Sequence, residues 1–163
     1  MKRLILAVLI AVPLFASDAS NEITPANVVA LMNEYRADAG LPPLRIDARI
    51  TRAAEDRMRD MEETGYWSHE SPTGMSPFTW LAARDYTFEA AAENLASGFE
   101  TARFLVASWM ESHGHRDNIM SAEYEDCGVA IIDGATTGRA TGKSIVVLFG
   151  RPRDDEGPPA ERP

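Results

Sequence analysis

The sequence predicts an α+β fold, a three-layer α/β/α sandwich in which helices cover both faces of a small antiparallel sheet. Two observations carry this prediction. Apolar residues recur at helical spacing through much of the 163-residue chain, and two segments near its end are rich in Val, Ile and Phe. Both of these strand segments are apolar on both faces. A strand of that kind needs cover on each side, which places the sheet between helical layers.

A single domain is expected between a leader and a tail. Lys2 and Arg3 precede an apolar run and then small residues, which is typical of a secretory signal peptide. The run is too short to span a bilayer comfortably. We therefore predict a signal peptide over 1–19, a domain over 20–153, and a charged, proline-rich disordered tail over 154–163. The mature protein would have no transmembrane segment and would be extracellular or periplasmic.

Charge and cysteine content exclude some classes of partner. Loss of the leader would change the net charge from −9 to −10, because it removes Lys2, Arg3 and Asp18. An acidic protein of this kind is not expected to bind nucleic acid or to adhere electrostatically to anionic lipid. Cys127 has no second cysteine to pair with, and we interpret it as a small buried hydrophobe rather than a nucleophile.

Two amphipathic helices are expected first. Thr24 is a suitable N-cap with Pro25 at the first helical position, and Gly40 stops this helix. Asp47 caps the second helix and Gly65 ends it. Their apolar faces hold Val28, Leu31, Met32 and Tyr35 in the first helix, and Ile50, Ala53, Ala54, Met58 and Met61 in the second.

Shorter helices and two strands follow. Ser76-Pro77 opens a short third helix, and Thr101 caps a fourth that Gly114 interrupts before a last turn. The strands run from Cys127 to Asp133 and from Lys143 to Gly150. The Gly/Thr-rich residues between them predict a hairpin loop, so the two strands should be antiparallel.

The three histidines stand in two short polar clusters, Ser68-His69-Glu70-Ser71-Pro72 and Ser112-His113-Gly114-His115-Arg116. A third polar pair, Glu93-Asn94, interrupts an alanine-rich segment. Imidazoles and a carboxylate from separate segments are the groups that a metal site or an acid/base site needs. Glu93 in an apolar segment needs a partner, which could be an imidazole or the backbone amides at a helix end. In an extended stretch His113 and His115 would face the same way, so His113 is a possible third ligand, but we interpret it as a surface residue.

These segments resemble a known family. The motifs are Ser68-His69-Glu70-Ser71-Pro72-Thr73-Gly74, Ala92-Glu93-Asn94-Leu95-Ala96 and Trp109-Met110-Glu111-Ser112-His113-Gly114-His115-Arg116-Asp117-Asn118-Ile119-Met120. They are similar to those of the CAP superfamily (cysteine-rich secretory proteins, antigen 5 and pathogenesis-related 1 proteins), in its bacterial SCP-like branch. The resemblance covers roughly 24–152 and implies an α-β-α sandwich with a central cavity.

The resemblance also implies a site of two histidines and two acids whose histidines can hold a divalent cation such as zinc. His69, Glu93 and His115 match three of these positions, and we take them as the candidate catalytic residues, with His69 and His115 as the metal ligands. The second acid would stand three residues after the tryptophan, where this chain has Ser112. Glu111 is adjacent, but on a regular helix it points about 100° away.

Three functions remain open at this point. The first is a secreted module whose cavity binds a divalent cation and a small or extended ligand, such as a lipid, a peptide or a cell-wall polymer. The second is a metal-assisted hydrolase of peptides or cell-wall components, with Glu93 as the general base. The third is a non-catalytic envelope or lipid-binding module in which the histidines and Glu93 only brace the loops. The sequence does not decide whether the protein is an enzyme.

Overall fold

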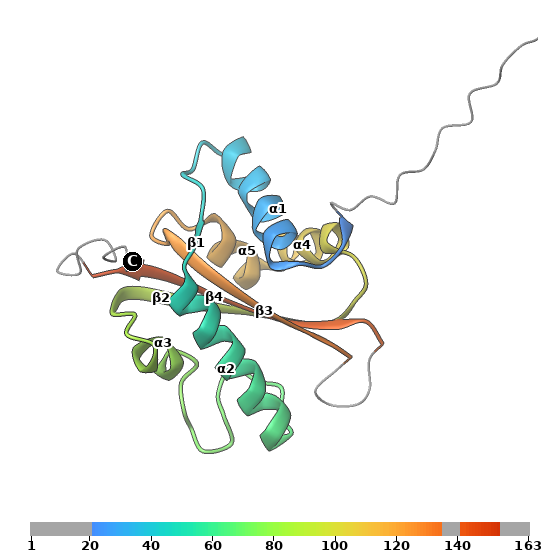
Figure 1. Ribbon diagram of the computed structural model, residues 1–163. Helices are drawn as coiled ribbons and strands as arrows, with labels where there is room; N and C mark the ends of the chain where they lie inside the picture. Colours follow the sequence, from blue (N-terminus) through green and yellow to red (C-terminus); the bar gives the residue numbers. More distant parts are fainter. Residues whose placement is uncertain (1–20, 135–140, 154–163) are drawn as a thin grey trace, which may run out of the picture.

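The computed structural model describes residues 21–134 and 141–153 (Figure 1). The predicted signal peptide and the predicted disordered tail lie outside these residues, as does most of the expected hairpin loop. The helices are α1 (Pro25–Asp38), α2 (Ala48–Thr64), α3 (Thr79–Ala83), α4 (Ala102–Glu111) and α5 (His113–Met120). The strands are β1 (Arg45–Ile46), β2 (Phe88–Phe99), β3 (Asp126–Asp133) and β4 (Lys143–Pro152).

Three layers are evident, as predicted. Helices α1, α4 and α5 lie on one face of the sheet, and α2 and α3 lie on the other (Figure 1). The core is correspondingly split by the sheet. On β3, Val129 packs into the α1/α4 side and Ala130 into the α2 side, while on β4 Val147 and Val146 divide in the same way. This confirms the expectation that the two strands are buried on both faces.

The sheet is larger than predicted and it is mixed. Its order is β1-β3-β4-β2, with β3 and β2 each antiparallel to β4. The short β1 pairs in parallel with Asp126 and Cys127 at the start of β3. Only β3 and β4 were expected from the sequence. The longest strand, β2, was missed because its alanine-rich sequence has low intrinsic β propensity, and pairing with β4 along its length overrides that preference.

The structure confirms the predicted N-caps Thr24, Asp47 and Thr101 and the predicted end of α2 at Gly65. The Thr24 hydroxyl accepts from Asn27 N at 3.2 Å, and the Asp47 carboxylate accepts from Arg49 N at 2.7 Å. Gly65 ends α2 in the left-handed conformation, with φ 72°. The third helix begins at Thr79, slightly later than expected, with Phe78 at the N-cap position.

The break between the fourth helix and the last turn was misplaced. Gly114 lies inside α5, and the helical conformation is interrupted at Ser112, whose φ of −90° and ψ of 119° are extended. Ser112 therefore ends α4 and begins α5. In the part of the chain that the structure describes, no helix combines the length and the apolar character that crossing a bilayer requires.

Candidate functional site

His69 and Glu93 are in direct contact. His69 stands in the loop after α2, and its Nδ1 lies 2.8 Å from Oε1 of Glu93 on β2. The Glu93 side chain is 2 % exposed, whereas that of His69 is 59 % exposed. A pocket of about 260 Å³ opens beside this pair, and it is lined by His69, Glu93, Glu70, Ser76, Pro77 and Phe78. The pair thus joins a buried carboxylate to a solvent-accessible imidazole.

Arg57 is the partner of Glu93 that sequence reasoning missed. Its Nε donates to Oε2 of Glu93 at 3.0 Å, and its side chain is fully buried. Its remaining nitrogens donate to the Tyr66 hydroxyl and to the carbonyls of Ser68 and His69, the latter at 3.1 Å. One guanidinium therefore holds both the carboxylate and the loop that carries His69.

A signal for Arg57 was present in the sequence. The apolar face of α2 places residue 57 four positions after Ala53 and four before Met61, so an arginine stands in the buried stripe. A charge at such a position requires a buried partner of opposite sign. Burial of the guanidinium is completed by the rings of Tyr66 and Trp80, whose centroids lie 5.3 Å and 5.1 Å from its central carbon.

Helix α5 brings the His115 backbone to the middle of β2, next to Glu93. The backbone carbonyl of His115 accepts from Nδ2 of Asn94, at 3.1 Å, and Asn118 Nδ2 donates to Oδ1 of Asn94 at 2.8 Å. Asn94, which follows Glu93 on the strand, is fully buried. The His115 ring lies against Trp109, with centroids 6.3 Å apart. The two asparagines therefore tie α5 to the strand that holds Glu93.

The two imidazoles have opposite pKa shifts. The hydrogen bond with Glu93 raises the pKa of His69. Burial lowers the pKa of His115, and the nearby charge of His69 lowers it further. At neutral pH His115 is therefore a neutral imidazole with a free lone pair, as a metal ligand must be. His115 is not among the residues that line the pocket beside His69.

These shifts predict opposite pH dependences for two variants in chelator-treated protein. A raised pKa of His69 stabilises the fold below its unfolded value near 6.5, and this contribution is lost as pH rises through the folded pKa. A lowered pKa of His115 costs stability as pH falls below about 6.5. His115→Ala should therefore lose less stability at pH 5 than at pH 8, and His69→Ala should lose more. Urea unfolding at pH 5 and pH 8 measures the free energy of unfolding of each variant and of the wild type. The prediction would be contradicted if each variant lost the same free energy at both pH values.

The other sequence candidates lie elsewhere. His113 is exposed on α5, and its Nδ1 lies 2.8 Å from Oδ2 of Asp117. Because residues 113 and 115 are helical rather than extended, their side chains diverge by about 200°, and they do not form the suggested histidine pair. Glu111 is exposed. The position expected for a second acid is thus Ser112, at the junction of two helices.

Cys127 is buried in the α1/α4 side of the core, with no exposed surface. Burial raises the pKa of its thiol to about 12. A thiol in this environment is not ionised at neutral pH, so it is not a nucleophile. This agrees with its interpretation as a small core residue.

The donor set available to a metal is small. Among the described residues, no group of three or more His, Cys, Asp or Glu side chains is arranged to hold an ion. Both Glu93 oxygens are engaged, Oε1 by His69 and Oε2 by Arg57. Glu93 is therefore suited to orient the His69 ring, as carboxylates behind metal-ligating histidines do, and less suited to bind an ion itself. The described part of the chain thus offers a metal at most the two imidazoles, and its other ligands would have to be water or a bound molecule.

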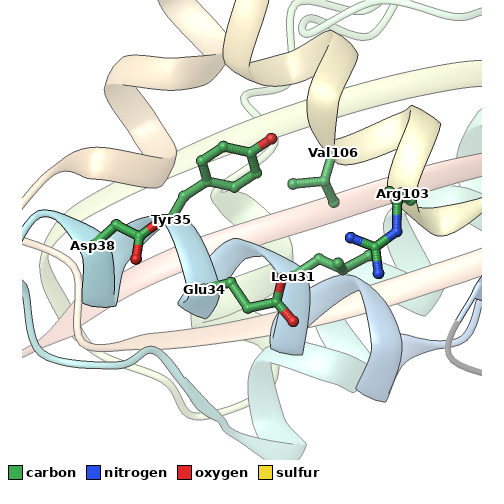
Figure 2. A pocket seen from close by; sticks show the side chains of 6 residues that line it. All are labelled: Leu31, Glu34, Tyr35, Asp38, Arg103 and Val106. Carbon is green, nitrogen blue, oxygen red and sulfur yellow. The ribbon is translucent and has the colours of Figure 1, made fainter.

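A second pocket, of about 240 Å³, lies between α1 and α4 (Figure 2). Its lining side chains are Leu31, Glu34, Tyr35, Asp38, Arg103 and Val106. It belongs to the helical layer on the α1 side of the sheet and shares no lining residue with the pocket beside His69. The histidine site is thus a separate feature of the molecule.

With the fold and the site described, the chain can be compared with known protein families. The model of the CAP, or cysteine-rich secretory protein, family matches residues 29–148. The chain belongs to this family.

Two curated relatives come from Bacillus subtilis. The CAP domain is 37 % identical over 106 residues to the uncharacterized protein YkwD, and 30 % identical over 104 residues to the uncharacterized membrane protein YlbC. These matches cover 65 % and 64 % of this chain, but 41 % and 30 % of the two relatives. The CAP domain thus spans less than half the length of either relative.

Solved structures support the same assignment. The CAP domain is similar to an extracellular SCP-domain protein from Bacillus anthracis, with a TM-score of 0.66 and 27 % identity over 78 % of this chain and 40 % of that one. An outer surface protein from Borrelia burgdorferi has a TM-score of 0.68 at 23 % identity, covering 77 % of this chain and 90 % of that one. At that identity the second likeness shows the fold alone. The α+β sandwich and the bacterial CAP family are therefore confirmed.

Proposed function

We propose that this CAP domain is a secreted binding module in which His69 and His115 hold a divalent cation, such as zinc, beside a ligand pocket. The observation that carries the proposal is the chain of contacts Arg57–Glu93–His69. Glu93, held by Arg57, binds the His69 ring at Nδ1, and this leaves Nε2 of His69 available as a metal ligand. The neutral state of His115 supports a second ligand. A cation held by these two imidazoles would supply Lewis acidity.

The pocket lining suggests what the ligand offers. Pro77 and Phe78 form an apolar wall, while Ser76 and Glu70 provide hydrogen-bonding groups beside His69. Small or extended ligands with alternating apolar and polar groups fit this lining, which is why a lipid, a peptide or a cell-wall polymer is proposed. Secretion is proposed from the leader-like sequence of the first residues together with the extracellular and outer-surface proteins that the fold resembles.

A hydrolase is the less favoured alternative. A general base must be free to take a proton from water, and Glu93 already accepts from His69 and Arg57 with its two oxygens. The chain has Ser112 where the family resemblance predicts a second acid. These two features favour binding over turnover. The third candidate, a non-catalytic module without metal, is separated from the proposal by the following measurement.

Zinc titration by calorimetry should give saturable binding near one ion per chain for the wild-type protein. The variant His69→Ala/His115→Ala should lose this binding, because both proposed ligands are removed. His113→Ala removes an exposed imidazole of the same helix as His115 and should bind zinc like the wild type. If the double variant took up zinc as the wild type does, the metal proposal would be overturned. If the double variant lost zinc but still bound a ligand in the pocket as tightly as the wild type, the module without metal would be favoured.

A further inference from the structure

The turn after α2 bends the chain back onto Arg57. Gly65 ends the helix in the left-handed conformation, and Tyr66 N donates to Met61 O at 3.1 Å. The Tyr66 ring thereby returns to the helix, where its centroid lies 5.3 Å from the central carbon of the Arg57 guanidinium. The carbonyl of His69 then accepts from Nη2 of the same guanidinium at 3.1 Å. The segment from Gly65 to His69 is therefore wrapped around one buried cation.

The Tyr66 hydroxyl connects Arg57 to a second carboxylate. Nη1 of Arg57 donates to the hydroxyl oxygen, and the hydroxyl donates to Oδ2 of Asp60. These directions are fixed by chemistry, because a guanidinium has only donors and a carboxylate has only acceptors. Asp60 stands one helical turn after Arg57, and its Oδ2 lies 3.9 Å from Nη1. Asp60 thus holds the hydroxyl hydrogen and leaves a lone pair of the hydroxyl oxygen for the arginine.

A continuous chain of hydrogen bonds therefore runs from His69 through Glu93, Arg57 and Tyr66 to Asp60. His69 is held in it twice, by its ring on Glu93 and by its backbone carbonyl on Arg57. Both anchors depend on the orientation of one guanidinium, whose Nε faces Glu93 and whose Nη2 faces the loop. Nη1, on the Tyr66 hydroxyl, is the remaining point that fixes this orientation.

We propose that Tyr66 and Asp60 are positioning residues for His69, which act through Arg57 and Glu93 to keep Nδ1–H of the imidazole on Glu93 and Nε2 free for a cation. This role rests on the proposed function, in which His69 is a metal ligand. Packing alone does not require the Tyr66 hydroxyl, because a phenylalanine ring would keep the contacts with the α2-side core and with the guanidinium. Groups behind a metal-ligating histidine typically change metal affinity about 10- to 100-fold.

The tautomer of the neutral His69 ring tests this role without any metal. An imidazole in water prefers its proton on Nε2, whereas a ring that donates to Glu93 carries it on Nδ1. NMR of the nitrogen-labelled protein, at a pH above the pKa of the ring, should show mainly the Nδ1–H tautomer in the wild type. In Tyr66→Phe and in Asp60→Leu the Nε2–H tautomer should increase several-fold, with the backbone amide spectrum showing that the fold is kept. An unchanged tautomer in both variants would overturn the proposal.

Zinc calorimetry on the same variants measures the consequence for the site. Tyr66→Phe and Asp60→Leu should each weaken zinc binding about 10-fold or more. Asp60→Asn should bind zinc nearly as the wild type does, because its amide oxygen still accepts from the Tyr66 hydroxyl. Tyr35→Phe makes the same substitution at an exposed ring on α1 and should have no effect.

The two readouts separate this proposal from the proposed function. Wild-type zinc affinity in both Tyr66→Phe and Asp60→Leu would refute the positioning role. A wild-type protein that binds no zinc would instead overturn the proposed function, and the His69 tautomer would still decide whether Tyr66 and Asp60 position the ring.

Discussion

Replacing Arg57 by methionine is expected to lower the free energy of unfolding by about 3–5 kcal/mol, the usual effect of breaking a buried ion pair from one side. Glu93 would keep its contact with His69 but lose the guanidinium at 3.0 Å, and its side chain is only 2 % exposed. The loop carbonyls of Ser68 and His69 would also lose their donor. Urea denaturation followed by tryptophan fluorescence measures the loss.

The matched control is Arg59→Met on the same helix. The Arg59 side chain is 59 % exposed and its partner Asp56 is partly exposed, so the loss should stay below about 1 kcal/mol. The double variant Arg57→Met/Glu93→Gln should recover part of the stability, since a neutral amide is less costly to bury than an unpaired carboxylate. Equal losses for Arg57→Met and Arg59→Met would show that the buried network contributes little to stability.

The second large effect is expected for Gly128→Ala. A Cβ at this position of β3 would lie 2.2 Å from Thr51 N and 2.3 Å from Ile50 C at the start of α2. These are backbone atoms and cannot move aside as a flexible side chain could. The helix must shift away from the sheet, at a cost of about 1–3 kcal/mol or more. Thermal unfolding followed by circular dichroism should show the lowered midpoint.

Gly114→Ala is the corresponding control, because it adds the same methyl group at a helical glycine. No atom lies within 4 Å of a Cβ built at Gly114 in α5. Alanine should stabilise that helix by about 0.5–1 kcal/mol, as it loses less conformational entropy than glycine on folding. If Gly128→Ala were as well tolerated as Gly114→Ala, the close approach of α2 to β3 would not determine the position of that helix.

Local sequence features predicted the helices on the α2 side of the molecule well. The Asp47 cap, the Gly65 terminus and the apolar stripe from Ile50 to Met61 are all found as expected. These are short-range features: a cap bonds to amides two or three residues away, and a terminal glycine acts through its own φ. The uninterrupted apolar sequences of β3 and β4 likewise predicted that both faces of each strand are buried.

The candidate site was predicted only in part. The motifs named His69 and Glu93, and the structure brings them into contact. Arg57 was overlooked because α2 was judged by its apolar residues, although a charge in that stripe was visible. The roles of His69, Glu93 and His115 in catalysis or metal binding stay predictions. His113 was considered as a ligand because its segment was treated as extended, whereas it is helical from residue 113 onward.

The amino-acid sequence by itself determined the helix caps, the apolar faces of the helices and the polar motifs, because each of these depends on residues only a few positions apart. The strand character of the alanine-rich β2 and the partner of Glu93 arise only when distant segments meet. β2 is held by pairing with β4, about fifty residues further along the chain, and Arg57 reaches Glu93 across 36 residues. Such long-range contacts outweigh weak local preferences because each buries apolar surface or satisfies a buried charge.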